Sequence, residues 1–168
     1  MDDADRLAGL VRAAQRGDGL AMAELIDVLA PLVGRWCGPI ALQDAADAAQ
    51  EALIAIFRGL RGLREPAALF GWARAIAVRE ALRVARRSAG ERPAELARVP
   101  ARDDPTLAAD IRDMLDRLAP EHRAVLMLRD VEGLDERTAA ALLRVPKGTV
   151  KSRLARARES FRKGWLRQ

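Results

Sequence analysis

The sequence is poor in the residue types that support disulfide bonds, metal centres and covalent catalysis. Its 168 residues include one cysteine, Cys37, one histidine, His122, and no tyrosine. A single cysteine excludes an internal disulfide, and one Cys with one His falls short of the ligand sets that hold transition metals. The sequence also has no phosphate-binding glycine loop and no nucleophile–base set. We therefore expect no cofactor, no metal, no catalytic residue and no small-molecule substrate.

Residues that favour β-strands are also scarce. Aromatic residues make up 4% of the chain, whereas 50% of it is hydrophobic and rich in Ala and Leu. This composition predicts an all-α fold. No uninterrupted apolar run approaches the 18 residues of a membrane span, and the first residues, MDDADRLAGL, are acidic and lack a secretory apolar core. We expect a cytoplasmic protein that is not inserted in a membrane.

Positive charge is concentrated in two parts of the chain. The net charge is +5, and residues 144–168 contain nine basic residues with Glu159 as the one acid. A second basic run comprises Arg79, Arg83, Arg86 and Arg87, with Glu80 among them. Such runs are either solvated helix faces or surfaces that displace counterions from the phosphates of a nucleic acid.

Residues 88–105 divide the chain into two predicted helical domains, residues 1–87 and 106–168. This segment contains Gly90, Pro93, Pro100 and Pro105 and few large apolar residues, so we interpret it as a flexible linker. Hydrophobic periodicity, prolines and capping residues predict helices over Asp5–Arg16, Gly19–Leu29, Pro31–Cys37, Asp44–Leu60, Ala67–Arg87, Leu107–Leu118, Pro120–Asp130, Glu136–Leu143 and Lys147–Lys163.

The last two predicted helices have the spacing of a helix-turn-helix. Asp135 is a good N-cap for the first, and a three-residue turn, Arg144-Val145-Pro146, leads to the basic second helix. At 100° per residue, one narrow apolar stripe of that helix comprises Val150, Leu154, Ala157 and Phe161. The opposite, polar side would enter a DNA major groove.

Several strings resemble the bacterial RNA polymerase sigma factors of the extracytoplasmic-function (ECF) type, within the sigma-70 family. LAPEHRAVLMLRDVEGLDERTAAALLRVPKGTVKSRLARARESFRK is similar to the family's region 4. DAADAAQEALIAIFRGL resembles the helix of region 2 that binds core polymerase, and FGWARAIAVREALRVARR resembles the promoter-reading helix that follows it. The resemblance implies an alternative sigma factor, with region 2 at 1–87, a linker at 88–105 and region 4 at 106–168.

The resemblance also implies partners and residue roles. The partners are core RNA polymerase, promoter DNA and an anti-sigma protein. Core polymerase would contact Asp44, Asp47, Gln50 and Glu51. The −10 element or non-template strand would contact Arg74, Arg79, Arg83, Arg86 and Arg87. Base edges of the −35 element would contact Lys151, Ser152, Ala155, Arg156 and Glu159, and phosphates would contact Arg137, Thr138, Lys147, Thr149, Arg153 and Arg158.

Two departures from the family pattern bear on DNA recognition. Arg79 stands where the promoter-reading helix usually has Asn, and Arg144 replaces the Gly of the turn, where a positive φ is expected. Two other functions remain open: a sigma-like decoy that binds polymerase or an anti-sigma protein without initiating, and a stand-alone helix-turn-helix regulator. A flexible linker would let the two domains close on each other or on an inhibitor and cover both DNA surfaces.

Overall fold

The computed structural model describes residues 3–91 and 107–167, and the regular structure in these ranges is helical, as predicted. The helices of the first half are α1 (Asp3–Gln15), α2 (Gly19–Ala41), α3 (Ala45–Gly59) and α4 (Leu69–Glu91), with short 3-10 turns at Leu42–Asp44, Leu60–Gly62 and Pro66–Ala68. Those of the second half are α5 (Leu107–Asp116), α6 (Pro120–Leu126), a π-helical turn η4 (Met127–Val131), α7 (Glu136–Leu143) and α8 (Lys147–Trp165).

Helix α2 is the central helix of the first half and contacts α1, α3 and α4. Its fully buried side chains include Leu25, Leu29 and Val33, which recur every four residues and so form one face. The prediction of two separate helices at 19–29 and 31–37 was wrong, because α2 continues through Pro31 and Pro39. An interior proline costs roughly 3 kcal/mol, and burial of this long apolar face offsets that cost.

The apolar character of α2 also bears on the expectation of no membrane span. The continuous helical stretch Gly19–Gly62 contains an 18-residue window with a mean hydropathy of 1.4, enough by length and composition to cross a membrane. The buried positions of α2 face the rest of the bundle, and the helix also carries the charged residues Glu24, Asp27 and Arg35. The window is 39% buried, so a core role in the bundle accounts for part of its hydropathy, while Leu20, Ile26 and Val28 of the same helix are exposed.

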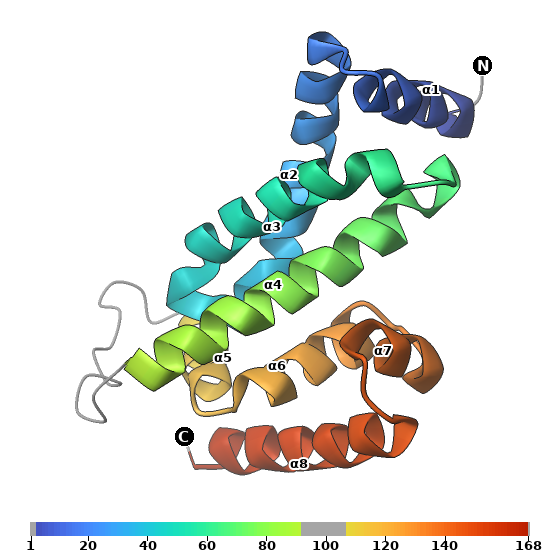
Figure 1. The fold of residues 1–168 in the computed structure, drawn as a ribbon. Coiled ribbons are helices and arrows are strands. Elements are labelled where there is room, and N and C mark those ends of the chain that lie inside the picture. Colours follow the sequence, from blue (N-terminus) through green and yellow to red (C-terminus); the bar gives the residue numbers. More distant parts are fainter. Residues whose placement is uncertain (1–2, 92–106, 168) are drawn as a thin grey trace.

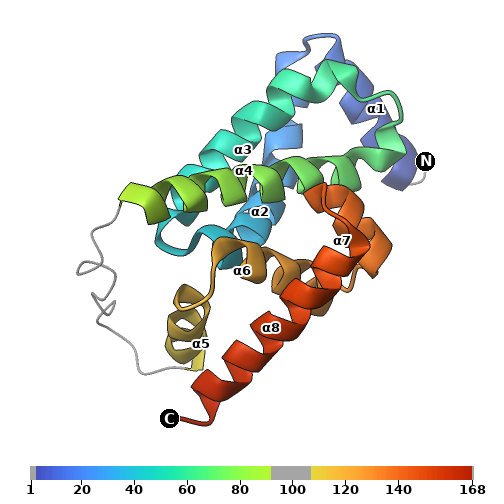
Figure 2. The same ribbon diagram turned by 60° about the horizontal axis from the view of Figure 1, so that its bottom comes forward.

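In the second half, α6 and α7 both pack against α8, while α5 lies beside the C-terminal end of α8 (Figure 2). The sequence predicted that the last helix would end at Lys163, but α8 continues through Gly164 to Trp165. A Cβ at Gly164 would lie 3.4 Å from Cγ of the buried Met114 on α5. Gly164 thus lies inside the helix, where it faces Met114 of α5.

The two halves pack directly on each other. Helix α6 contacts both α2 and α4, and α7 contacts α4. Figures 1 and 2 show α4 between α3 on one side and the second half on the other. The buried side chains of both halves form one continuous hydrophobic cluster. Helix α4 therefore packs against α2, α3 and the second half at once.

Helix α4 ends later than predicted. Residues 88–91, assigned to the linker from the sequence, are the last residues of this helix. Residues 69–92 contain no proline, so the helix can continue past Gly90. The rest of the predicted linker, residues 92–105, lies outside the described residues.

Candidate nucleic-acid and polymerase interfaces

The helix-turn-helix has the predicted geometry at both ends of its first helix. The carboxylate of Asp135 accepts a hydrogen bond from the Thr138 amide at 2.7 Å, which caps α7 and lowers the pKa of Asp135. At the other end, Arg144 has φ 56° and ψ 44°, the left-handed conformation expected from the missing glycine. The Val145 amide then donates to the Ala140 carbonyl at 3.1 Å and closes the turn.

Helix α8 has one buried side and one exposed side, as its sequence predicted. Val150, Leu154 and Ala157 are buried against α6 and α7, and Phe161 is half-buried. The five predicted base-contacting residues are all exposed on the other side: Lys151, Ser152, Ala155, Arg156 and Glu159. The Ser152 hydroxyl donates to the Thr149 carbonyl, and Glu159 pairs with Lys163 at 2.8 Å. The exposed side therefore presents small and cationic residues together, which suits approach to a groove.

The predicted phosphate contacts differ in their surroundings. Arg137, Thr138 and Lys147 are exposed, and Thr149 and Arg153 are half-buried. The guanidinium of Arg158 already donates to both carboxylate oxygens of Asp130, with 3.0 Å from Nε to Oδ2. This hydrogen bonding lowers the pKa of Asp130 and raises that of Arg158. Arg158 would have to leave Asp130 to bind a phosphate.

His122 on α6 lies beside the basic side chains of α8. Burial lowers the pKa of His122, repulsion by Arg153 and Arg156 lowers it further, and the nearby carboxylate of Glu121 opposes them. Because burial is the largest of these causes, the lowered pKa reflects the half-buried position of the imidazole first and the neighbouring arginines second.

The residues predicted to contact polymerase lie on α3 or just before it, and two of them, Asp47 and Glu51, pair with arginines of α4. Asp47 and Gln50 are exposed, whereas Asp44 and Glu51 are half-buried. Arg87 donates to Asp47 at 3.3 Å and to Glu51 at 3.4 Å, and Arg83 also pairs with Glu51 and with Glu80. The structure thus brings two of the four predicted polymerase contacts, Asp47 and Glu51, into one ion-pair network with two of the predicted −10 contacts.

The other three predicted −10 arginines reach the second half. Arg74 pairs with Glu132 at 3.4 Å, and Arg86 pairs with Glu121. Arg79 donates to the Leu142 carbonyl at 3.4 Å. Its pKa is lowered by burial and then by repulsion from Arg144, against an opposing attraction from Glu80. In this arrangement all five arginines of the set bind protein oxygens.

Sequence reasoning missed the residues that join the halves. Arg123 is only 7% exposed and donates from Nε to the Ile40 carbonyl of α2 at 2.9 Å. Glu132, whose side chain is 12% exposed, lies between Arg74 and Arg35. One signal was available: Arg123 precedes the buried Met127 by four residues and so occupies a core position of α6, where a charge requires partners.

Within the described residues, no three His, Cys, Asp or Glu side chains come together as a metal site would require. A shallow cavity of about 310 Å³ lies between α1 and the end of α3, where Gln15 donates to the carbonyls of Leu60 and Leu63. The charged surfaces of α3, α4 and α8 are therefore the main candidate functional surfaces.

The second half matches a family model, and both halves have full-length relatives. Residues 108–161 match the model described as "Sigma-70, region 4". The RNA polymerase sigma-H factor of Pseudomonas aeruginosa is 32% identical over 182 aligned residues, covering 92% of this chain and 91% of the relative. The ECF RNA polymerase sigma-E factor of Escherichia coli K12 is 30% identical, covering 90% of each chain.

The mycobacterial relative is longer. The ECF RNA polymerase sigma factor SigE of Mycolicibacterium smegmatis is 37% identical over 131 residues, covering 71% of this chain, and the aligned part spans 51% of that protein. The fold matches the structure of CnrH in complex with the cytosolic domain of CnrY, with a TM-score of 0.64, 22% identity and 96% coverage of both chains. It also matches the sigma factor RpoE of Bartonella quintana in complex with the anti-sigma factor NepR, with a TM-score of 0.62, 21% identity and 86% and 96% coverage.

Proposed function

Because this chain belongs to the ECF RNA polymerase sigma factors of the sigma-70 family, we propose that it binds core RNA polymerase and directs initiation at specific promoters. The observation that carries the proposal is α8, which keeps a cationic, small-residue side exposed while its apolar side is buried in a helix-turn-helix. Such a helix can enter a major groove without unfolding or rearranging its own domain.

We assign region 2 to residues 1–91 and region 4 to residues 107–168, with the linker shortened to residues 92–106 to follow the end of α4. In region 2, the carboxylates of Asp47 and Glu51 lie four residues apart on α3 and form an acidic face for a basic partner helix on polymerase, with Asp44 and Gln50 beside them. The arginines of α4 would track the −10 strand.

In region 4, base edges of the −35 element would contact the exposed residues of α8, with Arg156 as the principal donor. Phosphates would be held by Arg137, Thr138, Lys147, Thr149, Arg153 and Arg158, and Arg158 would exchange Asp130 for a phosphate. In this role the protein supplies binding surfaces and no catalytic group, acts in the cytoplasm and is restrained by an anti-sigma protein.

Two other functions predict different results for transcription by purified core polymerase. A sigma-like decoy would bind polymerase or an anti-sigma protein without starting transcription. A stand-alone regulator would bind DNA without polymerase, and the acidic face of α3 would then have no partner. The pairing of that face with Arg83 and Arg87 is equally compatible with a purely structural role of α3.

The test is transcription of fragmented genomic DNA by purified core polymerase with and without this protein, with sequencing of the 5′ ends. New discrete starts that share two upstream elements are the expected result. Absence of new starts with retained polymerase binding would favour the decoy. Absence of both would favour the stand-alone regulator.

Arg156→Ala tests the assignment of the −35 surface. We expect it to reduce initiation at the promoters found above by about tenfold or more, since a lost bidentate base contact costs roughly 1–3 kcal/mol. Arg112→Ala, an exposed arginine on α5, is the matched control and should leave initiation unchanged. Equal activity of the two variants would remove Arg156 from the set of base contacts.

A further inference from the structure

The arginines of the first half fall into two groups that differ in their partners. Those that bind carboxylate or carbonyl oxygens of the protein are Arg6, Arg35, Arg74, Arg79, Arg83, Arg86 and Arg87. The other arginines of this half are exposed and have no such partner within the described residues: Arg12, Arg16, Arg58, Arg61 and Arg64. These unpaired arginines are therefore its uncompensated positive charges.

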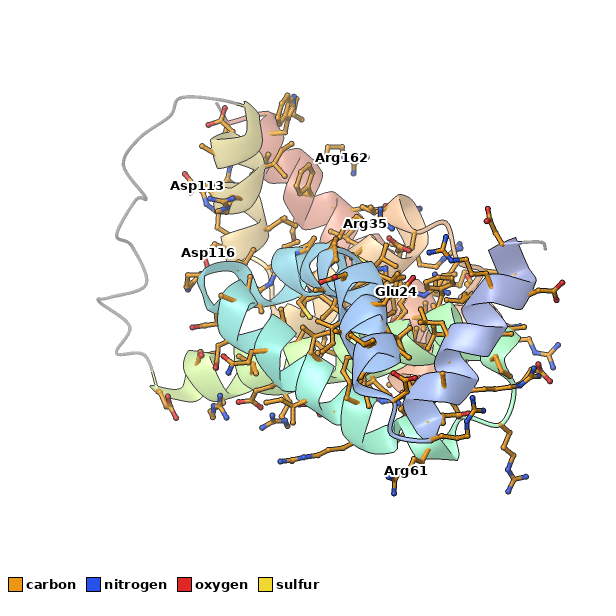
Figure 3. All side chains as sticks on the ribbon, turned by 90° about the horizontal axis from the view of Figure 1, so that it is seen from above. Glu24, Arg35, Arg61, Asp113, Asp116 and Arg162 are labelled. Carbon is orange, nitrogen blue, oxygen red and sulfur yellow. The ribbon has the colours of Figure 1, made fainter. Side chains whose placement is uncertain are left out.

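The unpaired arginines gather at one end of the bundle, where α1 and α3 end. Two of them lie in the last turn of α1 or just after it, and three lie in the last turn of α3 or in the segment that follows. Figures 1 and 2 show the turn between α3 and α4 beside α1, and the two are in contact. Figure 3 shows Arg61 near the end of α1, well apart from Arg162 of α8. This basic end is thus a surface separate from the helix-turn-helix.

Two acidic residues, Asp18 and Glu65, lie in the same turns as the unpaired arginines. The Asp18 carboxylate accepts hydrogen bonds from the amides of Leu20 and Ala21 and so serves as the N-cap of α2. Five guanidinium groups against two carboxylates leave this end with an excess of positive charge. Such an excess favours a polyanionic ligand, because binding releases the counterions condensed on its phosphates.

The shallow cavity between α1 and α3 lies among these arginines. Its volume is about 310 Å³, at the lower end of the range for small-molecule sites, which is about 300–1,000 Å³. Met22, Phe57 and Leu60 give it apolar lining, and Arg58 and Arg61 line it too. Phe57 is half-buried. An aromatic ring and apolar side chains next to two cations suit a nucleobase together with its phosphates.

Gln15 also lines the cavity, and it fixes the turn that carries Arg61. Its amide nitrogen donates to the carbonyls of Leu60 at 2.9 Å and Leu63 at 2.7 Å. Both amide hydrogens are thus used, so Gln15 can offer a ligand only its oxygen, which accepts. The amino groups of adenine, cytosine and guanine can donate to that oxygen, whereas thymine has no amino group.

We propose that this basic end is a single-strand DNA site, in which Arg58 and Arg61 hold phosphates and the cavity takes one unpaired base that has an amino group. The proposal rests on the proposed function, because it gives the promoter strand a second contact besides α4. Helix α4 begins at this end, since the turn Pro66–Ala68 just before it contacts α1. A strand that follows α4 can therefore continue to the unpaired arginines. Arg58 and Arg61 can bind it without leaving a partner elsewhere in the described chain.

The first experiment measures binding of a single strand by the free, full-length protein. The probe is a fluorescent oligothymidine of about 12 nucleotides with one central cytosine, followed by anisotropy at several salt concentrations. Arg58→Ala/Arg61→Ala should weaken binding. It should also reduce the slope of log affinity against log salt concentration by about 1.4, since each phosphate contact on a single strand contributes about 0.7.

The matched control is Arg112→Ala/Arg117→Ala, which removes the same charge from two exposed arginines in the second half. The control should keep the wild-type slope. An unchanged slope in Arg58→Ala/Arg61→Ala, or an equal reduction in the control, would overturn the proposal. Circular dichroism verifies that the helices of each variant remain folded.

The base-binding role of the cavity is tested separately from its charge. Phe57→Leu keeps an apolar side chain but removes the ring, and it should lower the affinity by about fivefold or more, since base–aromatic stacking has at least this effect. The salt slope should stay the same. Replacing the central cytosine of the probe by thymine should also weaken its binding to the wild type. Equal affinity for the two strands would refute the preference for an amino group.

Two measurements locate the strand and identify its source. Ultraviolet cross-linking followed by mass spectrometry should attach the probe to Phe57 or a neighbouring residue of the cavity, and cross-links confined to α8 would overturn the proposal. Free dCMP at the concentration of the probe should not displace it. Displacement would assign the cavity to a free nucleotide and overturn the strand as its ligand. Because polymerase is absent from these measurements, a failure to initiate transcription leaves their outcome unaffected.

Discussion

Replacing Arg144 by glycine should stabilise the protein, because the backbone at this residue has a conformation that side chains disfavour. At φ 56° and ψ 44°, a residue with a Cβ costs roughly 1–2 kcal/mol relative to the right-handed region. Glycine removes that cost. Its greater conformational entropy, however, stabilises the unfolded state by about 0.5–1 kcal/mol. The net stabilisation is about 0.5–1 kcal/mol. For a chain of this size it corresponds to a rise in Tm of about 2 °C.

Thermal unfolding followed by circular dichroism measures the effect, and Arg137→Gly provides the opposite case. Arg137 is the second residue of α7, where glycine costs up to about 1 kcal/mol, so the Tm of this variant should fall. The two variants make the same chemical change on the same helix-turn-helix and should differ by about 4 °C. A lower Tm for Arg144→Gly than for the wild type would refute the argument, since it would mean that the side chain contributes more than its backbone costs.

Two further predictions concern titratable groups. Burial raises the pKa of Cys37 to about 12, so its thiol should not react with a disulfide reagent at pH 8 until the protein unfolds. Rapid reaction of the native protein would contradict the burial of this side chain on α2. The hydrogen bond from Arg158 lowers the pKa of Asp130 below its ordinary value of 3.8, so its contribution to stability is present above that value and is lost as the pH falls through the folded pKa. Arg158→Ala should raise the pKa of Asp130 in a carboxyl NMR titration, and an unchanged pKa would exclude Arg158 as the cause.

The sequence predicted the local features of the fold well. The range of α7, its Asp135 cap, the positive φ of Arg144 and the buried stripe of α8 were all found as expected. These features depend on residues close together in the chain, whose periodicity and capping chemistry can be read directly. The uninterrupted course of α2 could not be read this way, because the packing that overrides Pro31 comes from α3 and α4.

The sequence suggested candidate site residues, but it did not indicate which side chains those residues contact in the fold. Nothing in the spacing of Arg74 or Arg86 indicates Glu132 or Glu121, which lie 58 and 35 residues away. Pairings over such distances depend on how the two halves pack. Periodicity within single helices carries no information about that packing. The core position of Arg123 on α6 was the one local sign of the interface.

The ion pairs between α3 and α4 have a consequence for how DNA binding responds to salt. An arginine that binds a phosphate releases condensed counterions from DNA, but Arg83 and Arg87 already have Glu51 and Asp47 as neighbours. If a basic helix of polymerase pairs with those carboxylates, the guanidinium groups of Arg83 and Arg87 lose their ion-pair partners and become uncompensated charges beside the promoter. The affinity for DNA should then fall more steeply with salt concentration in the polymerase complex than in the free protein. The acidic face would thus act as a removable set of counterions carried by the protein itself.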